Sequence, residues 1–201
     1  MYKFARFVFT IYCHLFNRFR VYGRENEPIE GPVIVYANHQ SMFDIFALNL
    51  AIKRHINFMA KASLFKVPII KSVVKLYGAF PVDREKADLS AIKNALKTLN
   101  SEHILGIFPE GTRVKNGLTK DGKAPEIKPG FVMIAQKSKA TMLPVRIYYK
   151  RLFFLFNDIR VYIGKPFLIE DEFEGGVPSE DMAKAGDMLM QKVYNLGSEA
   201  K

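Results

Sequence analysis

From residue 33 onward, short apolar runs alternate with longer segments of helical periodicity, and this alternation limits the fold more than any other feature. The runs expected as strands are 32–37, 56–60, 79–82, 103–108, 141–149 and 158–164. The segments expected as helices are 41–52, 63–76, 88–99, 129–138 and 179–196. Pro68 can break or kink the second of these helices, and Asp88 is a natural N-terminal cap of the third. Strands that alternate with helices predict an α/β fold, in which helices flank a mixed, largely parallel sheet.

The N-terminal segment 1–22 has a different character, and we expect it to form an amphipathic helix ahead of one domain over 23–201. At helical spacing one side is apolar, with Phe4, Phe7, Val8, Ile11, Leu15 and Phe19, and another carries Arg6, Thr10, Cys13 and Asn17. The longest uncharged run, 7–17, is too short for a membrane-spanning helix of about 20 residues. An apolar face with flanking cations can lie in a membrane interface, or it can pack on the protein's own core. Both interpretations stay open on this segment alone.

The charge balance is strongly basic, and it restricts the classes of partner. The 201 residues include 30 Lys and Arg against 20 Asp and Glu, which gives a net charge of +10. Such a charge attracts polyanions, so nucleic acid, an anionic membrane surface and phosphorylated small substrates all fit. No helix-turn-helix, zinc-finger or RNA-binding signature accompanies the charge, and we therefore expect no nucleic-acid partner. The single cysteine, Cys13, allows no intramolecular disulfide and suits a reducing compartment.

Polar residues follow several of the expected strands, at the edge where parallel sheets carry their sites. Asn38, His39 and Asp44 come directly after the strand 32–37. Asp44 in the first helical turn can reach one ring nitrogen of His39, fix the tautomer and leave the other nitrogen to take a proton from a hydroxyl. A purely structural interpretation also fits, with Ser41 as the helix N-cap and Asp44 as the acidic partner of a capping box.

The segment FPEGTR, residues 108–113, follows another expected strand. Gly111 lets backbone N–H groups approach a ligand closely, Thr112 adds a hydroxyl, and Arg113 offers a two-pronged contact to phosphate. The loop 114–128 carries four lysines, and a loop of this length in a compact domain is usually functional or mobile. We therefore expect an anion-binding loop, and the alternative is a turn with solvated charges.

Two further cations lie near expected strand ends. Arg84 follows the strand 79–82 and is a second candidate ligand of a phosphate, although it can also form a surface pair with Asp83. The segment 61–71 interleaves lysines with apolar residues. That pattern suits a groove for an apolar chain near a membrane surface, and it suits an ordinary amphipathic helix equally well.

Four of these segments, in this order, resemble the motifs of the 1-acyl-glycerol-3-phosphate acyltransferases, which are the lysophosphatidic acid acyltransferases. The first motif, N-H-x-x-x-x-D, corresponds to Asn38, His39 and Asp44; the second to Gly78, Phe80 and Arg84; the third, F-P-E-G-T-R, to residues 108–113 without departure; and the fourth, an apolar stretch around a proline, to residues 143–145. The resemblance covers residues 38–145, and the ordered set is far more specific than one motif. It implies the glycerolipid acyltransferase fold.

The resemblance also implies a mechanism. His39, oriented by Asp44, would act as general base on the 2-hydroxyl of lysophosphatidic acid, whose oxygen attacks the thioester of an acyl donor directly. The residues implied to hold the phosphate end of the acceptor are Arg84, Glu110, Gly111, Thr112 and Arg113, with Glu110 positioning an arginine or the glycerol hydroxyl. Lys61, or a backbone N–H near Gly111, would stabilise the thioester oxyanion. The donor is acyl carrier protein or coenzyme A, and neither a cofactor nor a metal is implied.

An enzyme whose acceptor lies in a bilayer gains from an interfacial helix, so the resemblance favours membrane docking for 1–22. The expected location is an anionic membrane surface at the cytoplasmic face of the cell membrane, with peripheral or monotopic attachment. One alternative is the same chemistry on another lysolipid or on glycerol 3-phosphate. Another is a basic, non-catalytic membrane-binding module, against which the intact pair of His39 and Asp44 argues.

Overall fold

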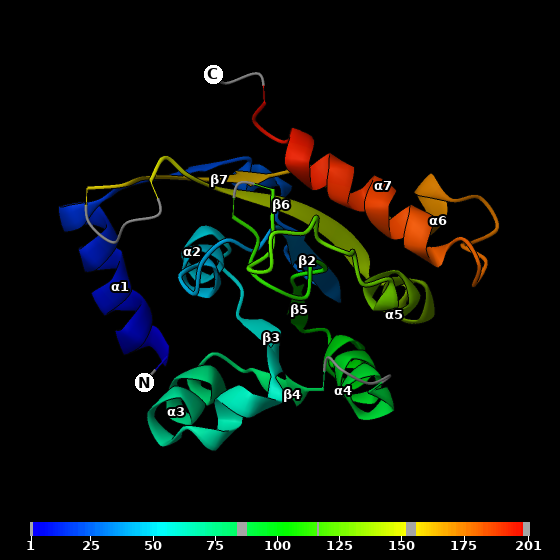
Figure 1. The fold of residues 1–201 in the computed structure, drawn as a ribbon, viewed down its shortest axis with the longest axis horizontal. Coiled ribbons are helices and arrows are strands. Elements are labelled where there is room, and N and C mark those ends of the chain that lie inside the picture. Colours follow the sequence, from blue (N-terminus) through cyan, green and yellow to red (C-terminus); the bar gives the residue numbers. More distant parts are fainter. Residues whose placement is uncertain (1, 84–87, 116, 152–155, 199–201) are drawn as a thin grey trace.

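The computed structural model describes residues 2–83, 88–115, 117–151 and 156–198, and it contains a seven-stranded sheet (Figure 1). The strands are β1 Arg18–Tyr22, β2 Val33–Ala37, β3 Ile56–Lys61, β4 Phe80–Val82, β5 Ile104–Ile107, β6 Thr141–Tyr149 and β7 Asp158–Ile163. Their order across the sheet is β1-β7-β6-β2-β5-β3-β4. Neighbouring strands are parallel, except that β6 and β7 are antiparallel. The predicted mixed, largely parallel sheet is therefore confirmed.

The five helices expected after residue 33 are all present, with some shorter than expected, whereas the short helix Ile169–Glu172 was not expected. The helices are α1 Tyr2–Phe16, α2 Asp44–Ala51, α3 Pro68–Leu76, α4 Leu89–Asn100, α5 Gly130–Ser138, α6 Ile169–Glu172 and α7 Met182–Asn195, with short 3-10 helices at Arg24–Asn26 and Ala62–Lys66. The break at Pro68 is confirmed, because a 3-10 helix precedes it and α3 starts at the proline. The cap of α4 is confirmed as well, since Asp88 accepts the N–H of Ala91 at 3.0 Å.

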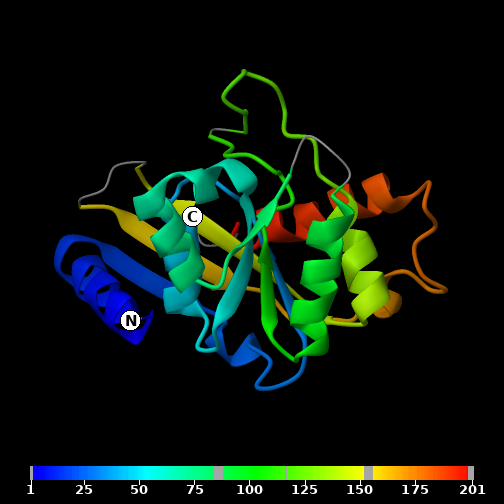
Figure 2. The ribbon, with the colours of Figure 1, turned by 90° about the horizontal axis from the view of Figure 1, so that it is seen from below.

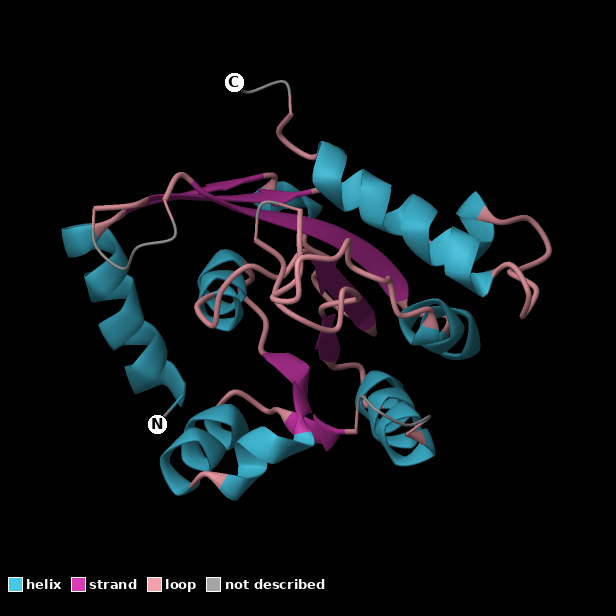
Figure 3. Ribbon diagram, viewed as in Figure 1, coloured by secondary structure: helices cyan, strands magenta, loops and turns pink. Residues whose placement is uncertain are grey.

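Two hydrophobic clusters fill the two faces of the sheet. On one face Tyr36, Leu105 and Met142 pack beneath α4, α5 and α7. On the other face Val35 and Leu143 pack beneath α2. Figure 3 shows the helices on both sides of the strands, and Figure 2 shows the sheet with its covering helices from below. Every residue of β2 is buried because both of its faces are covered, which explains why its sequence is continuously apolar.

The strand β1 corrects the expected N-terminal helix. The helix α1 ends at Phe16, and the residues that follow pair in parallel with β7. Phe19 and Val21 point into the cluster beneath α2, while the alternate residues are exposed. The prediction of one helix over 1–22 is therefore wrong past Phe16, because pairing with β7 supplies the backbone hydrogen bonds there. The sheet of the domain expected over 23–201 thus includes a strand from the N-terminal segment.

The helix α1 packs against α2 with one side and leaves much of its apolar surface exposed. Phe9 lies against Phe46 of α2, with ring centroids 4.8 Å apart, and Cys13 is completely buried. Phe7 and Leu15, on the side that the sequence marks as apolar, are 60% and 70% exposed. No described helix has the length and apolar character needed to cross a membrane.

Candidate active site

His39 and Asp44 form a hydrogen-bonded pair beyond the carboxyl end of β2. Nδ1 of His39 lies 2.7 Å from Oδ2 of Asp44, the first residue of α2. Asp44 is completely buried, and the imidazole of His39 stacks on the ring of Phe108 with centroids 4.2 Å apart. These contacts fix the plane of the imidazole and direct Nδ1 to the carboxylate. Nε2 is then the nitrogen left for proton transfer, as the sequence predicts.

The backbone before α2 also holds the Asp44 carboxylate. Oδ2 accepts the N–H groups of Gln40 at 2.6 Å and Ser41 at 2.9 Å. Ser41 is not the helix N-cap that the sequence predicts, because α2 begins only at Asp44 and its N-cap position is Phe43. The hydroxyl of Ser41 accepts the N–H of Phe43 instead, at 3.2 Å. Asp44 does accept the N–H of Ser41, as the acidic partner in a capping box does, and the same carboxylate orients His39.

Glu110 of the FPEGTR segment and Val114, the residue that follows the segment, hold the backbone of His39 from both sides. Oε2 of Glu110 accepts the N–H of His39 at 2.7 Å, and the N–H of Val114 donates to the carbonyl of His39 at 2.7 Å. The second oxygen, Oε1 of Glu110, accepts the hydroxyl of Tyr194 on α7 at 2.7 Å. Glu110 thus contacts the backbone N–H of His39 and the hydroxyl of Tyr194. The resemblance implies that it positions an arginine or the glycerol hydroxyl.

Glu110 is an unusual carboxylate because it is only 3% exposed. Burial raises its pKa to about 7; the hydrogen bonds from Tyr194 and from the N–H of His39 oppose this rise, and the nearby charge of Asp44 adds to it. A group with this pKa is partly protonated near neutral pH, so its hydrogen bond to the backbone of His39 depends on pH.

Two tyrosines of the site could not be identified from the sequence. Tyr149 donates its hydroxyl to Oδ1 of Asp44 at 2.7 Å, from a position 105 residues further along the chain. Tyr194 lies 84 residues from Glu110. No motif marks either residue. The alternation along β6 does place Tyr149 on the same face as Ile147, toward α2, but only the order of the strands brings it to Asp44.

Gly111 makes a turn rather than a donor site. Its N–H donates to the carbonyl of Phe108 at 3.0 Å, and its φ of 65° lies in the left-handed region that favours glycine. The backbone N–H of Gly111 is thus engaged inside the turn. The side chain of Lys61, the other group implied for the oxyanion, lines the cavity beside His39.

That cavity has a volume of about 390 Å³ and combines the features expected of an acyl-transfer site. The apolar part of its wall comes mainly from α2, β3 and α3, and includes Met42, Ile45, Phe46, Phe58, Ile69 and Val73. His39, Lys61, Thr112 and Arg113 line the same cavity. The structure therefore brings four of the predicted site residues together, with Asp44 behind the imidazole. The arrangement fits an apolar chain that carries an anionic group near the base.

The second motif of the resemblance is described only in part. Arg84 lies outside the described residues. Gly78 ends α3 with a φ of 63°, and a Cβ there would overlap the side chain of Asn57 and lie 2.7 Å from Nε2 of His55. This glycine therefore has a structural role, which is to turn the chain closely past β3 and into β4.

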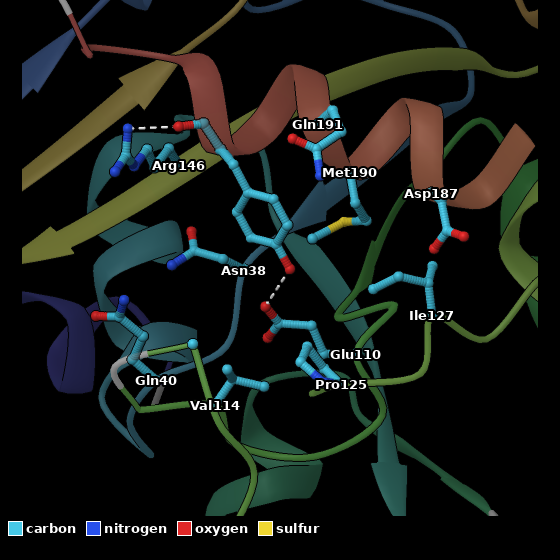
Figure 4. Close-up of a pocket in the computed structure, with 12 residues that line it drawn as sticks. Asn38, Gln40, Glu110, Val114, Pro125, Ile127, Arg146, Asp187, Met190 and Gln191 are labelled. Carbon is cyan, nitrogen blue, oxygen red and sulfur yellow. Dashed lines mark hydrogen bonds between the residues drawn. The ribbon is translucent and has the colours of Figure 1, made fainter. Parts of the chain in front are cut away.

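Glu110 also lines a second cavity, of about 560 Å³, which no motif in the sequence predicts (Figure 4). Figure 4 shows side chains from α7 on one side and from the loop after FPEGTR on the other. The guanidinium of Arg146 donates to the carbonyls of Tyr194 at 2.6 Å and Leu196 at 2.8 Å. These bonds fix the end of α7 to β6, and so they support the hydroxyl of Tyr194 that reaches Glu110.

Two expectations stay predictions. The loop 114–128 projects from the edge of the sheet in Figure 2, and Lys128 pairs with Glu126 at 2.7 Å, but its expected binding of anions is untested. Within the part of the chain that the structure describes, no group of three His, Cys, Asp or Glu side chains is placed to hold a metal ion. Activity after treatment with a chelator is the measurement that decides the metal requirement.

Comparison with known proteins points to one family. Residues 18–148 match the model of the family described as Acyltransferase. The chain is 32% identical over 200 residues to the 1-acyl-sn-glycerol-3-phosphate acyltransferase of Bacillus subtilis (strain 168), a match that covers 98% of this chain and 96% of that protein. It is 28% identical over 152 residues to the chloroplastic 1-acyl-sn-glycerol-3-phosphate acyltransferase LPAT1 of Arabidopsis thaliana, covering 72% of this chain and 41% of the plant protein. The crystal structure of the 1-acyl-sn-glycerophosphate (LPA) acyltransferase PlsC from Thermotoga maritima matches with a TM-score of 0.68 and 25% identity, over 94% of this chain and 76% of that one.

Proposed function

Because this chain belongs to the acyltransferase family, we propose that it transfers a fatty acyl group from a thioester to the 2-hydroxyl of 1-acyl-sn-glycerol 3-phosphate. The product is phosphatidic acid, a precursor of phospholipids. The observation that carries the proposal is the 2.7 Å contact between Nδ1 of His39 and Asp44, on the wall of a cavity that is largely apolar and also lined by cations. The names of the relatives support the acceptor.

The proposed reaction needs one base and no acyl-enzyme. Nε2 of His39 takes the proton of the 2-hydroxyl while its oxygen forms a bond to the thioester carbonyl carbon. The buried carboxylate of Asp44 stabilises the imidazolium that results. The C–S bond then breaks, and the imidazolium returns its proton to the thiolate that leaves. The ester of phosphatidic acid and a free thiol are the products, and the base is regenerated.

Cationic and polar side chains around the cavity are proposed to bind the negatively charged groups of the substrates. Lys61 is proposed to stabilise the oxyanion on the thioester carbonyl, and Thr112 and Arg113 to hold the phosphate of the acceptor. Arg84 joins them through the motif resemblance alone. Glu110 contributes indirectly, because it fixes the backbone of His39. The donor is acyl carrier protein or coenzyme A, and both are anionic partners for a chain of net charge +10.

The experiment that tests the reaction is acyl transfer to lysophosphatidic acid from a long-chain acyl thioester, in detergent or liposomes. The native protein is expected to form phosphatidic acid, and His39→Ala to lose at least about 100-fold in rate, because a general base contributes that much or more. His103→Ala is the matched control, since His103 is exposed and outside the site. Equal rates for His39→Ala and the native protein would contradict the assigned base.

The acceptor is tested separately from the chemistry. If lysophosphatidic acid gives no product while another lysolipid or glycerol 3-phosphate does, the acceptor assignment is wrong and the acyl transfer stands. If no acceptor reacts with either donor, the protein is not an active acyltransferase. Comparing acyl carrier protein with coenzyme A in the same assay identifies the donor.

We further propose that α1 docks the enzyme on an anionic membrane surface at the cytoplasmic face, with peripheral or monotopic attachment. Three apolar residues on its outer side, Phe7, Ile11 and Leu15, are 60%, 42% and 70% exposed, while Cys13 on the opposite side is buried. An exposed apolar helix side on a basic protein suits the boundary between headgroups and acyl chains. Cosedimentation with vesicles of anionic and zwitterionic lipid measures this binding.

A further inference from the structure

Tyr149 is a partly buried tyrosine at the end of β6 whose hydroxyl the mechanism above leaves without a role. It lies just past the segment 18–148 that matches the family, and outside the four sequence motifs. Its hydroxyl donates to Oδ1 of Asp44 at 2.7 Å. Its backbone is held by the sheet, where it pairs with Ile159 of β7. The position of the hydroxyl is thus set by β6, an element separate from the loop and helix that carry His39 and Asp44.

The two oxygens of Asp44 have different partners. Oδ2 accepts the ring N–H of His39 and the backbone N–H groups of Gln40 and Ser41. Among the described residues, Oδ1 accepts from Tyr149 only. Asp44 is completely buried, so water cannot simply take the place of a lost donor, and the loss costs free energy. Tyr149 is therefore the donor that holds the second oxygen, and with the three donors on Oδ2 it sets the rotation of the carboxylate about its Cβ–Cγ bond.

The surroundings keep Tyr149 protonated, so it can only donate to a charged Asp44. Burial, followed by the charge of Asp44 and by its hydrogen bond, raises the pKa of Tyr149 well above its ordinary value. The other titratable groups around the pair are His39 itself and Glu110, whose pKa the charge of Asp44 raises.

From this geometry we propose that Tyr149 is a positioning residue, which holds the Asp44 carboxylate so that Oδ2 stays directed at Nδ1 of His39. The role rests on the proposed function, since it acts through the base of that reaction. Tyr149 touches no reacting atom and transfers no proton. Its effect is on the fraction of molecules in which His39 has the correct tautomer and orientation.

The test compares Tyr149→Phe with Tyr148→Phe in the acyl-transfer assay. Phenylalanine keeps the ring and removes only the hydroxyl. Tyr148 is the matched control, because it is the preceding residue of β6, is exposed on the other face, and lies beneath the guanidinium of Arg160. Tyr149→Phe is expected to lower kcat by about 10- to 100-fold, the loss of one hydrogen bond to a charged group, with both KM values within about twofold. Tyr148→Phe is expected to stay within about twofold of the native protein in kcat.

A pH profile separates positioning from general damage. Without the Tyr149 hydroxyl, Oδ2 of Asp44 is less firmly directed at Nδ1, so the imidazolium loses part of its stabilisation and the acidic limb of kcat moves to lower pH, by about half a pH unit or more. A merely structural loss would lower the profile without moving it. A kcat within about twofold of native with an unmoved limb, or an equal loss in Tyr148→Phe, would overturn the proposal.

Two further measurements keep the test independent of the acceptor and of folding. In a cycle with Asp44→Asn, Tyr149→Phe is expected to cause no further loss, and an additive loss would contradict the role.

The proton on Nδ1 of His39 gives a downfield NMR resonance in the free protein when it is bound to Asp44. That resonance is expected to shift or broaden in Tyr149→Phe and to stay in Tyr148→Phe, and an unchanged resonance would contradict the role whatever the acceptor is. If native protein and His39→Ala were both inactive, the proposed function would fail while this NMR test still decided the contact.

Discussion

At the scale of single residues, the protonation of Glu110 makes both the stability of the fold and a hydrogen bond to the backbone of His39 depend on pH. Its carboxylate accepts the N–H of His39 and the hydroxyl of Tyr194, and burial raises its pKa from 4.5 to about 7. A carboxyl whose pKa is higher in the folded than in the unfolded state binds a proton on folding between these two values. Its contribution to stability is therefore fully present below pH 4.5 and is lost as the pH rises through 7.

This difference predicts a specific change in Glu110→Gln. Between pH 5 and pH 7.5, the unfolding free energy of the native protein should fall by up to about 3 kcal/mol more than that of Glu110→Gln, because the variant lacks the titrating group. Urea denaturation at the two pH values measures the difference. Glu170→Gln, at an exposed position of α6, is the control and should follow the native curve. Parallel curves for Glu110→Gln and the native protein would contradict the prediction.

The sequence identifies some site residues and hides others for a physical reason. His39 and Asp44 are five positions apart, so their contact is nearly local and a motif can record it. Tyr149 reaches Asp44 from 105 positions away, and such a contact exists only after β6 and β2 have become neighbours. The contact of Glu110 with Tyr194 could not be predicted either, because it depends on where α7 lies.

At the scale of secondary structure, β1 shows where periodicity is ambiguous. Phe19 continues the apolar side of the preceding helix at a spacing of four from Leu15, and it also alternates with Arg18 and Arg20 as in a strand. Five residues are too few for one period to exclude the other. The partner strand β7 decides the outcome, and it lies far along the chain. By contrast Asp88 and Pro68 act on their own neighbours, and their effects on α4 and α3 could be predicted.

Removing the N-terminal segment should therefore have two separable effects. A chain that starts at Asn17 lacks α1 and keeps β1, whereas a chain that starts at Gly23 also makes β7, paired with β6 alone, the edge strand of the sheet. The shorter chain is expected to aggregate and to unfold at a temperature lower by at least about 5 °C than the longer one. Size-exclusion chromatography and thermal unfolding of the two chains measure this. Equal stability and a monomeric state for both would contradict a structural role of β1.

At the scale of the whole molecule, the largely parallel sheet explains why separate motifs meet. The residues after β2, at the end of β3 and after β5 converge on one cavity, because the carboxyl ends of these parallel strands lie at the same edge. The sequence predicts this convergence from strand order along the chain. It does not predict the order across the sheet or the second cavity beneath α7, because both depend on which long-range pairs form.

The charge and the exposed side of α1 together predict how the molecule meets a lipid surface. Phe7→Ser with Leu15→Ser should weaken binding to anionic vesicles by at least about tenfold, since two apolar side chains no longer leave water. Ile29→Ser with Leu89→Ser is the matched control, because these residues are 92% and 76% exposed and lie outside α1. Added salt should weaken the binding of native and control proteins. An equal loss in both double variants would contradict docking through α1.

The pairing of β1 with β7 also sets an order of events during translation. The segment that holds α1 and β1 leaves the ribosome before β7, since Asn157, which donates its N–H to Asn17 beside β1, follows 140 positions later. At about 5–20 residues per second, roughly 7–30 s pass before β1 can find its partner. During that interval the outer apolar side of α1 is uncovered, as it also is in the complete fold, where Phe7 and Leu15 are exposed. A lipid surface can therefore receive the helix before the catalytic domain closes behind it.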